Sequence, residues 1–286
     1  MRPSILTDHT SARVATADPL TSADYWDEQW SGVSLPSLAS RATQWGPEAA
    51  ILDALDALVP LLPGKRVLEI GGAPGGHLAY LAKSHGVEPH MVDSSPVGCS
   101  MARRNFDLLG LSATINEGDL FRAPGDPASY DLVYSLGLLE HFVDFRSVIA
   151  RHAELATPGG YIFIEVPWFV HVFRRFIGSW SPATLAAHNL SALDMNNWDA
   201  VVRDLGLASI AKVYAGGFEP NVAVSLCPDP NVPPSAAFLA ACVRRLTWIR
   251  YHLYRVAPAC ARLQTLDSRW WSSVAYCVLR KPLGHS

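Results

Sequence analysis

Paired cysteines, lysines and long hydrophobic runs are the features that this 286-residue sequence has least of. The 5 cysteines are irregularly spaced and include no Cys-x-x-Cys pair, which argues against a zinc site or a disulfide framework and favours a reduced, cytoplasmic setting. The most apolar run, 161–173, is interrupted by Glu165, Pro167 and His171, so we expect no stable insertion into a membrane. Residues 1–10 contain no apolar segment of the signal-peptide kind.

The charge balance is weakly acidic, with 23 basic and 26 acidic residues and a net charge of −3. Such a chain has no general attraction for nucleic acid, so we expect no nucleic-acid partner. The composition is 49% hydrophobic and 17% charged, which indicates a globular core rather than disorder. The length suits one large α/β domain that carries a cap.

A short apolar strand, a glycine-rich turn and a helix follow one another between residues 67 and 84. The turn 71–76 is mostly glycine, which allows a sharp change of direction and a close approach of a ligand to the backbone. The free N–H groups at the start of the helix suit an anionic group such as a carboxylate. Glu69 lies near the end of the strand, where an acid is costly to bury without a partner.

Two further acids follow the next predicted strands. Asp93 lies near the C-terminal end of the segment 88–95, and an acid about 20 residues after a glycine-rich loop accepts hydrogen bonds from ribose hydroxyls in dinucleotide-binding folds. Asp119 follows the predicted strand 113–116. Each acid taken alone is also compatible with an ordinary turn or helix cap.

Alternating strands and helices predict a parallel sheet that is covered on both faces, with a binding crevice at the carboxyl ends of the strands. The predicted strands are 66–70, 88–95, 113–116, 130–135, 161–166, 208–214 and 273–279.

Three motifs of this sequence resemble those of class I S-adenosylmethionine (SAM) methyltransferases. The pattern Glu-x-Gly-x-Ala-x-Gly at 69–75 resembles their motif I, with Ala73 in place of the usual middle glycine. Leu-Glu-His at 139–141 is similar to the segment after strand four in ubiquinone-biosynthesis-type and related members. The Pro-Gly-Gly turn 158–160 before a hydrophobic strand is a further shared feature.

The resemblance implies a Rossmann-like, doubly wound, mainly parallel seven-stranded sheet with helices on both faces, plus a helical cap. It also implies SAM as the cofactor and a small molecule as the methyl acceptor. We divide the chain into an N-terminal arm and lid (1–45), a SAM-binding core (46–227) with a cap insertion (167–193), and a C-terminal cap helix with the last core strand (228–286).

The resemblance further implies individual roles. Asp93 would hold the ribose and Asp119 the adenine amino group, with the backbone N–H of Leu120 at the ring. The expected cofactor-binding residues are Glu69, Gly71, Gly72, Ala73, Gly75, Asp93, Ser94, Asp119, Leu120 and Ser135, and the expected acceptor-binding residues are Trp26, Trp168 and Phe173.

His141 is the leading candidate for a general base, because imidazole titrates near neutral pH and a hydroxyl acceptor benefits from a base. A purely structural or helix-capping role is equally compatible with its position. Glu140 could fix the imidazole ring or hold a divalent ion, but no other clear ligand is spaced with it. We therefore expect no metal site.

The acceptor atom and some rival functions stay open. O-methylation is the favoured reaction, and the alternatives are C- or N-methylation of a small molecule or lipid, or a SAM-binding relative that has no activity. A nicotinamide-dependent oxidoreductase would share the loop and Asp93, but the sequence has no Tyr-x-x-x-Lys pair. RNA ribose methyltransferases need active-site lysines, and none occurs between Lys83 and Lys212. The sequence does not specify an oligomeric state.

The segment 238–256 predicts an amphipathic helix, which we expect to form a cap over the crevice together with 168–193. Its apolar positions are Leu239, Cys242, Val243, Leu246, Ile249, Leu253 and Val256. Arg250 falls near this stripe, where it must reach solvent or meet an anion. Peripheral contact of this helix with a membrane is the alternative.

Overall fold

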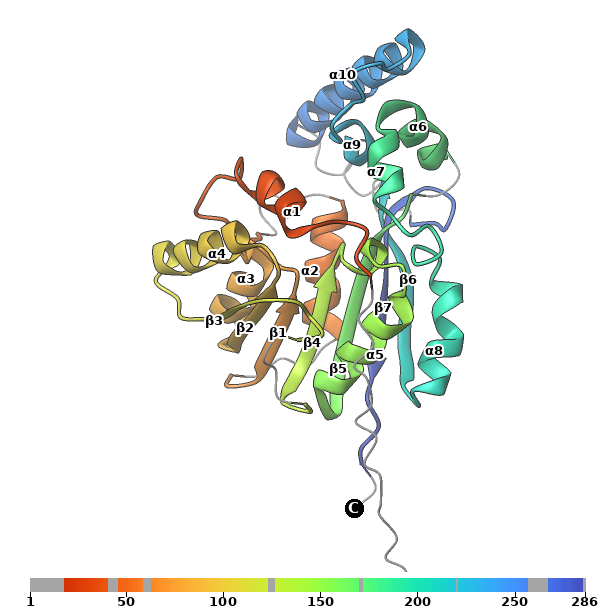
Figure 1. Ribbon diagram of the computed structural model, residues 1–286. Coiled ribbons are helices and arrows are strands. Elements are labelled where there is room, and N and C mark those ends of the chain that lie inside the picture. The colour runs from red at the N-terminus through yellow and green to blue at the C-terminus, as the bar shows by residue number, and fades with distance from the viewer. Residues whose placement is uncertain are drawn as a thin grey trace, which may run out of the picture.

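The computed structural model describes residues 18–40, 46–58, 63–122, 127–169, 172–219, 221–256 and 267–284. Its strands are β1 Arg66–Ile70, β2 Glu88–Asp93, β3 Thr114–Glu117, β4 Tyr130–Leu136, β5 Ala156–Pro167, β6 Ala208–Phe218 and β7 Ser272–Arg280. They form one seven-stranded sheet in the order β3-β2-β1-β4-β5-β7-β6 (Figure 1). The strands from β3 to β5 are parallel, whereas β7 runs antiparallel to both β5 and β6. The predicted fold class, a mainly parallel seven-stranded sheet, is confirmed.

Helices cover both faces of this sheet and gather above its upper edge in Figure 1. They are α1 Ala23–Trp30, α2 Pro47–Leu58, α3 Gly76–His85, α4 Pro96–Leu109, α5 Phe145–Leu155, α6 Val172–Trp180, α7 Pro182–Ala186, α8 Asp199–Asp204, α9 Asn221–Val224 and α10 Pro234–Val256, with the short 3-10 helices η1 Leu139–His141 and η2 Met195–Trp198. Residues 1–17 of the predicted N-terminal arm lie outside the described residues.

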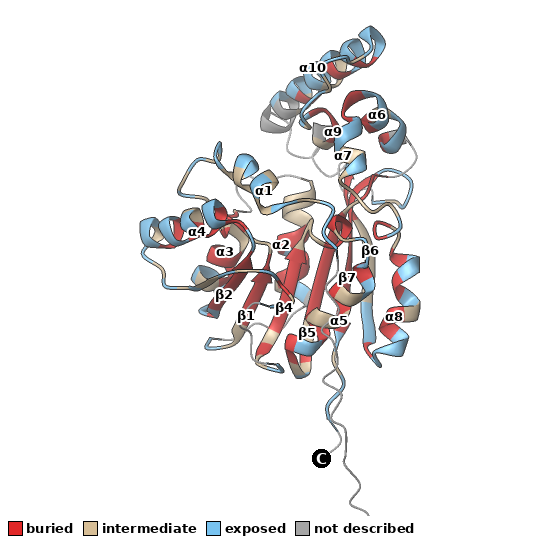
Figure 2. Ribbon diagram, viewed as in Figure 1, coloured by how far each residue is buried: buried red, intermediate tan, exposed pale blue. Residues whose placement is uncertain are grey.

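Two hydrophobic cores lie on opposite faces of the sheet. On one face, residues of α2, α3 and α4 such as Leu55, Leu78 and Phe106 pack against β1 and its neighbours. On the other face, α5 and α8 pack against alternate residues of the same strands, including Leu68 and Val133. The central strands β1, β4, β5 and β7 are therefore buried on both sides, as Figure 2 shows in red, and this explains why they are apolar without alternation.

Helix α10 packs on α6 and α9 through its smallest side chains. Ala236, Ala240 and Thr247 are buried, whereas Phe238 is 72% and Leu246 is 64% exposed. The apolar stripe predicted for this helix is therefore mostly directed outward, because only small residues let the helix approach its neighbours closely. Figure 2 shows α10 at the top, with much of its surface exposed.

Arg250 joins α10 to the end of β6 and the residue that follows it. Its guanidinium donates to the carboxylate of Glu219, which is 5% exposed. The expectation that Arg250 reaches solvent or meets an anion is thus confirmed in its second form. None of the helices among the described residues is both long and apolar enough to cross a membrane.

Candidate functional site

A cavity of about 340 Å³ lies at the carboxyl ends of β1, β2 and β4. Parallel strands of an open α/β sheet place ligands at this end. Helix α1 closes the cavity from the side of α4 (Figure 1). The residues that line it are Pro19, Thr21, Ser22, Ala23, Trp26, Trp30, Ile70, Gly71, Val92, Asp93, Ser94, Gly118, Asp119, Leu120, Leu136, Gly137, Leu138 and Phe142. Five of the predicted cofactor-binding residues therefore meet at one cavity: Gly71, Asp93, Ser94, Asp119 and Leu120.

The glycine-rich turn between β1 and α3 supplies one wall of the cavity. A Cβ atom on Gly72 would lie 2.2 Å from the carboxyl carbon of Glu69, so only glycine fits there. Gly75 has a φ of +85° and directly precedes α3, a conformation that favours glycine. The Glu69 side chain is buried beneath the turn, and burial raises the pKa of this carboxyl to about 7. Glu69 thus supports the loop from below rather than lining the cavity.

Asp93 is fixed at the end of β2 by backbone donors. Its carboxylate accepts hydrogen bonds from the backbone N–H of Ala73 (3.2 Å) and of Ser95 (2.9 Å), so it joins the glycine-rich turn to the start of α4. Asp93 is 5% exposed and lines the cavity. Burial raises the pKa of this carboxyl, and the nearby Asp27 raises it further, whereas the two backbone donors oppose the shift.

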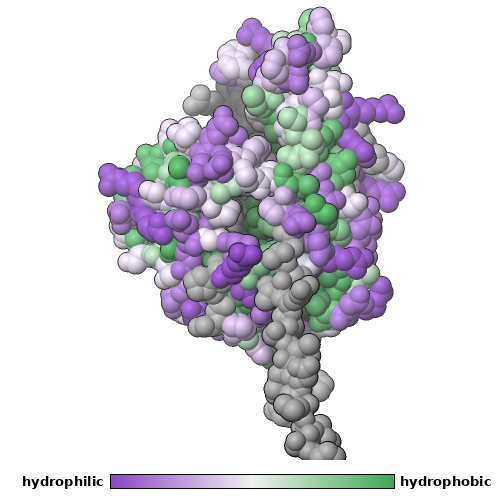
Figure 3. All heavy atoms as spheres, in the orientation of Figure 1, coloured by the Kyte–Doolittle hydropathy of each residue, from purple (hydrophilic) through white to green (hydrophobic). Residues whose placement is uncertain are grey.

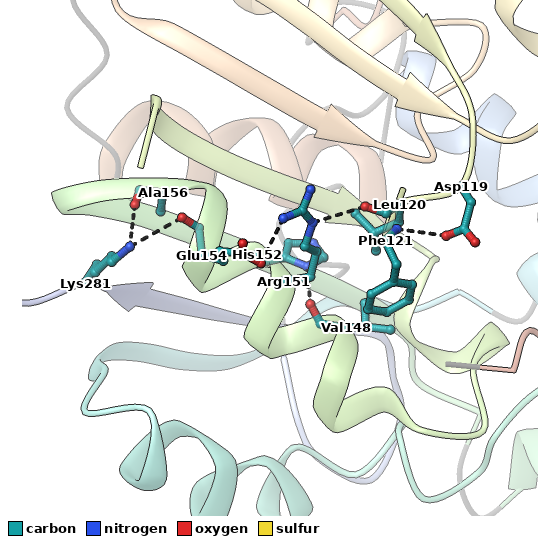
Figure 4. A network of polar contacts seen from close by, with 9 residues as sticks. All are labelled: Asp119, Leu120, Phe121, Val148, Arg151, His152, Glu154, Ala156 and Lys281. Carbon is teal, nitrogen blue, oxygen red and sulfur yellow. Dashed lines mark hydrogen bonds and ion pairs between the residues drawn. The ribbon is translucent and has the colours of Figure 1, made fainter. Parts of the chain in front are cut away.

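The loop after β3 carries Asp119 and Leu120 into the cavity. The backbone N–H of Phe121 donates to Asp119 Oδ1 at 2.8 Å. The Arg151 guanidinium of α5 donates to the carbonyl of Leu120 at 3.1 Å (Figure 4). These two contacts fix the position of the loop relative to the sheet and α5. The Asp119 carboxylate itself stays exposed to solvent, which is an accessible position for recognising an amino group.

Asp27 attaches helix α1, the segment that we expect to act as a lid, to the core. Asp27 Oδ1 accepts hydrogen bonds from Ser95 Oγ (2.5 Å) and from the backbone N–H of Val97 (3.2 Å), both at the start of α4. On the same helix, Trp26 and Trp30 stack with ring centroids 5.8 Å apart and line the cavity. This helix belongs to the expected arm and lid 1–45, but no sequence signal identified Asp27 as its attachment, because Ser95 is 68 residues away.

Replacing Asp27 with alanine should weaken binding of the expected cofactor, SAM, about 5- to 30-fold, since a hydrogen bond to a charged group contributes roughly 1.5–3 kcal/mol and part of this closes the lid. Calorimetry measures the effect. Glu28→Ala is the matched control, because Glu28 is an exposed acid on the same helix. Equal SAM affinity in the two variants would show that the lid does not depend on Asp27.

His141 lies next to this lid, at the end of η1. Its Nδ1 is 2.9 Å from the carbonyl oxygen of Ala187, and its ring meets the Trp26 ring edge-to-face with centroids 4.9 Å apart. Burial, together with the neighbouring His188, lowers the pKa of His141 to about 4. His141 is therefore a neutral imidazole at pH 7. The cavity is lined by its neighbours Trp26 and Phe142.

Ser135 lies beneath the cavity rather than in its lining. It is fully buried in β4, and its hydroxyl is 3.0 Å from Nε2 of His152 on α5. His152 also contacts the carbonyl of Val148 through Nδ1 (Figure 4). Ser135 therefore joins the sheet to α5, and its effect on the cofactor is indirect.

Trp168 and Phe173, which we expected to bind the acceptor, do not line this cavity. Both are buried in the core that joins β5 to α6, with 6% and 7% exposure. Trp168 Nε1 donates to the carbonyl of Arg269, and this indole lines a separate hollow of about 420 Å³. Of the three predicted acceptor-binding residues, Trp26 alone lines the cavity at the strand ends.

The cap insertion reaches the site at another point. The backbone N–H of Asn189 donates to the carbonyl of Glu140 at 2.6 Å, and His188 contacts His141 with ring centroids 4.6 Å apart. By contrast, α10 supplies none of the described residues that line the cavity. In Figure 3 hydrophobic residues (green) gather below these upper helices, beside the centre of the face shown.

A family of methyltransferase domains matches residues 44–211, more than half of the chain. The chain belongs to this methyltransferase domain family. Together with the seven-stranded sheet, this match confirms the methyltransferase fold that the sequence predicted.

Curated relatives are similar over part of their length. A probable chloroplastic tocopherol O-methyltransferase of Oryza sativa is 32% identical over 106 residues, which cover 36% of this chain and 29% of the relative. A ubiquinone biosynthesis O-methyltransferase of Methylocella silvestris is 28% identical over 156 residues, which cover 46% of this chain and 60% of the relative. The chain thus spans only part of these relatives.

Solved structures share the fold over most of the chain. The geranyl diphosphate C-methyltransferase of Streptomyces coelicolor has a TM-score of 0.56 at 11% identity, and the match covers 94% of this chain and all of that one (100%). A sarcosine dimethylglycine methyltransferase of Galdieria sulphuraria, named as provisional, has a TM-score of 0.53 at 16% identity and covers 91% of this chain and 98% of that one. At these identities the likeness concerns the fold alone.

Proposed function

We propose that this methyltransferase transfers the methyl group of SAM to a hydroxyl group of a small molecule. The observation that carries the proposal is the meeting of Gly71, Asp93 and Asp119 at one cavity beneath an aromatic lid. These residues come from three separate strand ends, and no single one of them would identify a SAM site.

Each part of SAM has a matching group in this cavity. The Asp93 carboxylate accepts hydrogen bonds from the ribose hydroxyls, since a carboxylate is an acceptor with two oxygens. Asp119 accepts from the adenine amino group, and Leu120 lies against the ring. The glycine-rich turn and the start of α3 receive the methionine end of the cofactor, where helix N–H groups favour a carboxylate.

Methyl transfer from a sulfonium is an in-line displacement in which the leaving group departs neutral, so no acid is needed. The enzyme has to align the acceptor with the methyl group and exclude water. Trp26 and Trp30 provide the water-excluding cover. The Nε2 lone pair of His141 is the proton acceptor in our proposal, since its Nδ1 faces a carbonyl and must carry the hydrogen.

Oxygen is the favoured methyl acceptor because relatives of this chain are named O-methyltransferases. The cavity walls contributed by Leu138, Phe142 and Trp26 are apolar, which suits an apolar or lipidic alcohol or phenol. We assign no nucleic-acid acceptor, given the net charge of −3. We also propose a reduced, cytoplasmic setting, which is supported by the free cysteines Cys99, Cys227, Cys242 and Cys277 among the described residues.

Calorimetry with SAM and NAD, followed by an acceptor screen with labelled SAM, tests this function. We expect micromolar binding of SAM, none of NAD, and label transfer to phenolic or alcoholic acceptors. Binding of NAD in place of SAM would overturn the proposal in favour of an oxidoreductase. Tight SAM binding with label transferred only to amines or carbon acids would overturn the hydroxyl assignment, and no transfer to any class would indicate a non-catalytic relative.

A further inference from the structure

Three potential metal ligands meet where the cap insertion touches the end of β4. Glu140 and His141 belong to η1, and His188 follows α7. One ligand atom of each lies within 4.8 Å of the other two, and His141 Nε2 is 4.0 Å from Glu140 Oε1. His188 is 47 positions from His141, so the sequence could not show this third ligand.

Both imidazoles are held in the tautomer that a metal requires. His141 Nδ1 faces the carbonyl of Ala187, and His188 Nδ1 faces the carbonyl of Thr184. A carbonyl oxygen only accepts hydrogen bonds, so each Nδ1 must carry the hydrogen and each Nε2 keeps its lone pair. Metal-binding histidines commonly donate their second ring N–H in this way, which fixes the ring orientation.

Glu140 supplies the independent observation. Its side chain is 1% exposed, and Oε2 has no hydrogen-bond partner among the described residues. A buried carboxylate oxygen without a partner is costly. The charge of a cation, placed between this carboxylate and the two imidazoles, would remove that cost.

We propose that Glu140, His141 and His188 form a binding site for a divalent first-row transition-metal ion such as Zn²⁺ or Mn²⁺. Two imidazole nitrogens and one carboxylate oxygen are a ligand set that such ions accept, and three protein ligands leave a position open for an exchangeable oxygen. Bond lengths of about 2.0–2.2 Å require the ligand atoms to draw together by roughly an ångström. His188 lies in the loop after α7, outside any helix or strand.

The site deepens the proposed function and rests on it for its chemical role. A bound divalent ion lowers the pKa of a coordinated hydroxyl, which activates a hydroxyl acceptor for attack on the methyl group. The ion would occupy the same His141 lone pair that otherwise accepts a proton, so the two routes are alternatives at one atom. Metal binding itself is measured without any turnover.

Titration of the metal-free protein with Co²⁺ tests the site, because visible absorption of Co²⁺ reports nitrogen and oxygen ligands. We expect saturation at a single Co²⁺ per chain, displaced by Zn²⁺. Glu140→Gln keeps the side-chain size but loses the charge, and His188→Ala removes one imidazole. Each should weaken Co²⁺ binding by at least about 100-fold, since even losing a partner that only orients a ligand costs roughly 10–100-fold.

His252→Ala is the matched control. His252 is exposed on α10, and its Nδ1 also faces a helix carbonyl, that of Trp248, at 2.9 Å. This variant should bind Co²⁺ like the parent protein. Thermal unfolding checks that each variant is folded. If Glu140→Gln does not fold, His188→Ala still tests the site, because His188 is only half-buried.

Two results would overturn the site: absence of saturable Co²⁺ binding in the parent protein, or equal affinity in His188→Ala and His252→Ala. SAM binding and label transfer by a protein without Co²⁺ affinity would reject the metal site and leave the proposed function standing. Saturable Co²⁺ binding without methyl transfer to any acceptor would support the metal site and reject the proposed function.

Discussion

Replacing His141 with alanine should lower turnover about 10²- to 10⁴-fold, the usual contribution of a positioned general base, with little change in SAM affinity. The imidazole lies beside the lid residue Trp26 and not among the groups that contact the cofactor in our assignment. Its neutral form carries the lone pair at Nε2, where an acceptor hydroxyl or a metal ion can use it. Turnover at saturating SAM and acceptor is the measurement.

The pH profile adds a second readout for His141. Burial holds the pKa of His141 near 4, below the unperturbed value of about 6.5. The imidazole therefore stays neutral as the pH falls through 6.5, and it gains a proton only near pH 4. We expect kcat/KM to lose no activity through His141 between pH 7.5 and about pH 5, and an acid limb at 6.5 that disappears in His141→Ala would contradict this assignment.

His141→Gln separates chemistry from structure. The glutamine amide can donate to the Ala187 carbonyl as the imidazole Nδ1 does, but it cannot accept a proton at neutral pH. A base or metal ligand predicts low turnover in both variants. Near-normal turnover in His141→Gln would show that the residue only anchors the loop after α7.

Replacing Asp93 with alanine should weaken SAM binding by roughly 1–3 kcal/mol, a factor of about 5–150, because the ribose hydroxyls would face a site without an acceptor. The carboxylate is buried at the cavity wall, so bulk water cannot easily replace it. Calorimetry with SAM gives the affinity directly. Unchanged affinity would remove Asp93 from the site.

Asp93 also holds two backbone N–H groups, so its control must share that structural role. Asp144 caps α5 by accepting from the N–H groups of Arg146 and Ser147, away from the cavity. Asp144→Ala should lower the free energy of unfolding by about 1 kcal/mol, typical of a lost helix cap, and leave SAM affinity intact. Equal losses of SAM affinity in both variants would make the effect on Asp93 structural.

The parts of the site that sequence predicted are those governed by local rules. Gly72 and Gly75 are required by the geometry of one short turn. Asp93 could be found because one helix and one strand follow this turn, and Asp93 lies at the end of that strand. Parallel strands then bring Asp93 and Asp119 to the same edge without further information, because all their carboxyl ends point one way.

The parts that sequence did not predict depend on contacts between distant segments. Asp27 meets Ser95, and His188 meets His141, only after the lid and the cap insertion have docked. Helical periodicity identified α10 but not its buried face, because packing on α9 and α6 selected small residues over large ones. The sequence suggested Trp168 for an acceptor pocket because its side chain is large and aromatic. A large aromatic side chain also packs well in a hydrophobic core, which is where Trp168 lies.

The position of β7 has a consequence for how the chain folds and for how it can be shortened. This last strand lies between β5 and β6. Its pairing with β5 joins Tyr161 to Arg280, two residues that lie far apart in the sequence. Pairings of such sequence separation form late, because the loop must close before the contacts stabilise it. Until residues 272–280 pair, the facing edges of β5 and β6 have no neighbouring strand. A chain cut before Ser272 would keep these edges unpaired and would tend to aggregate.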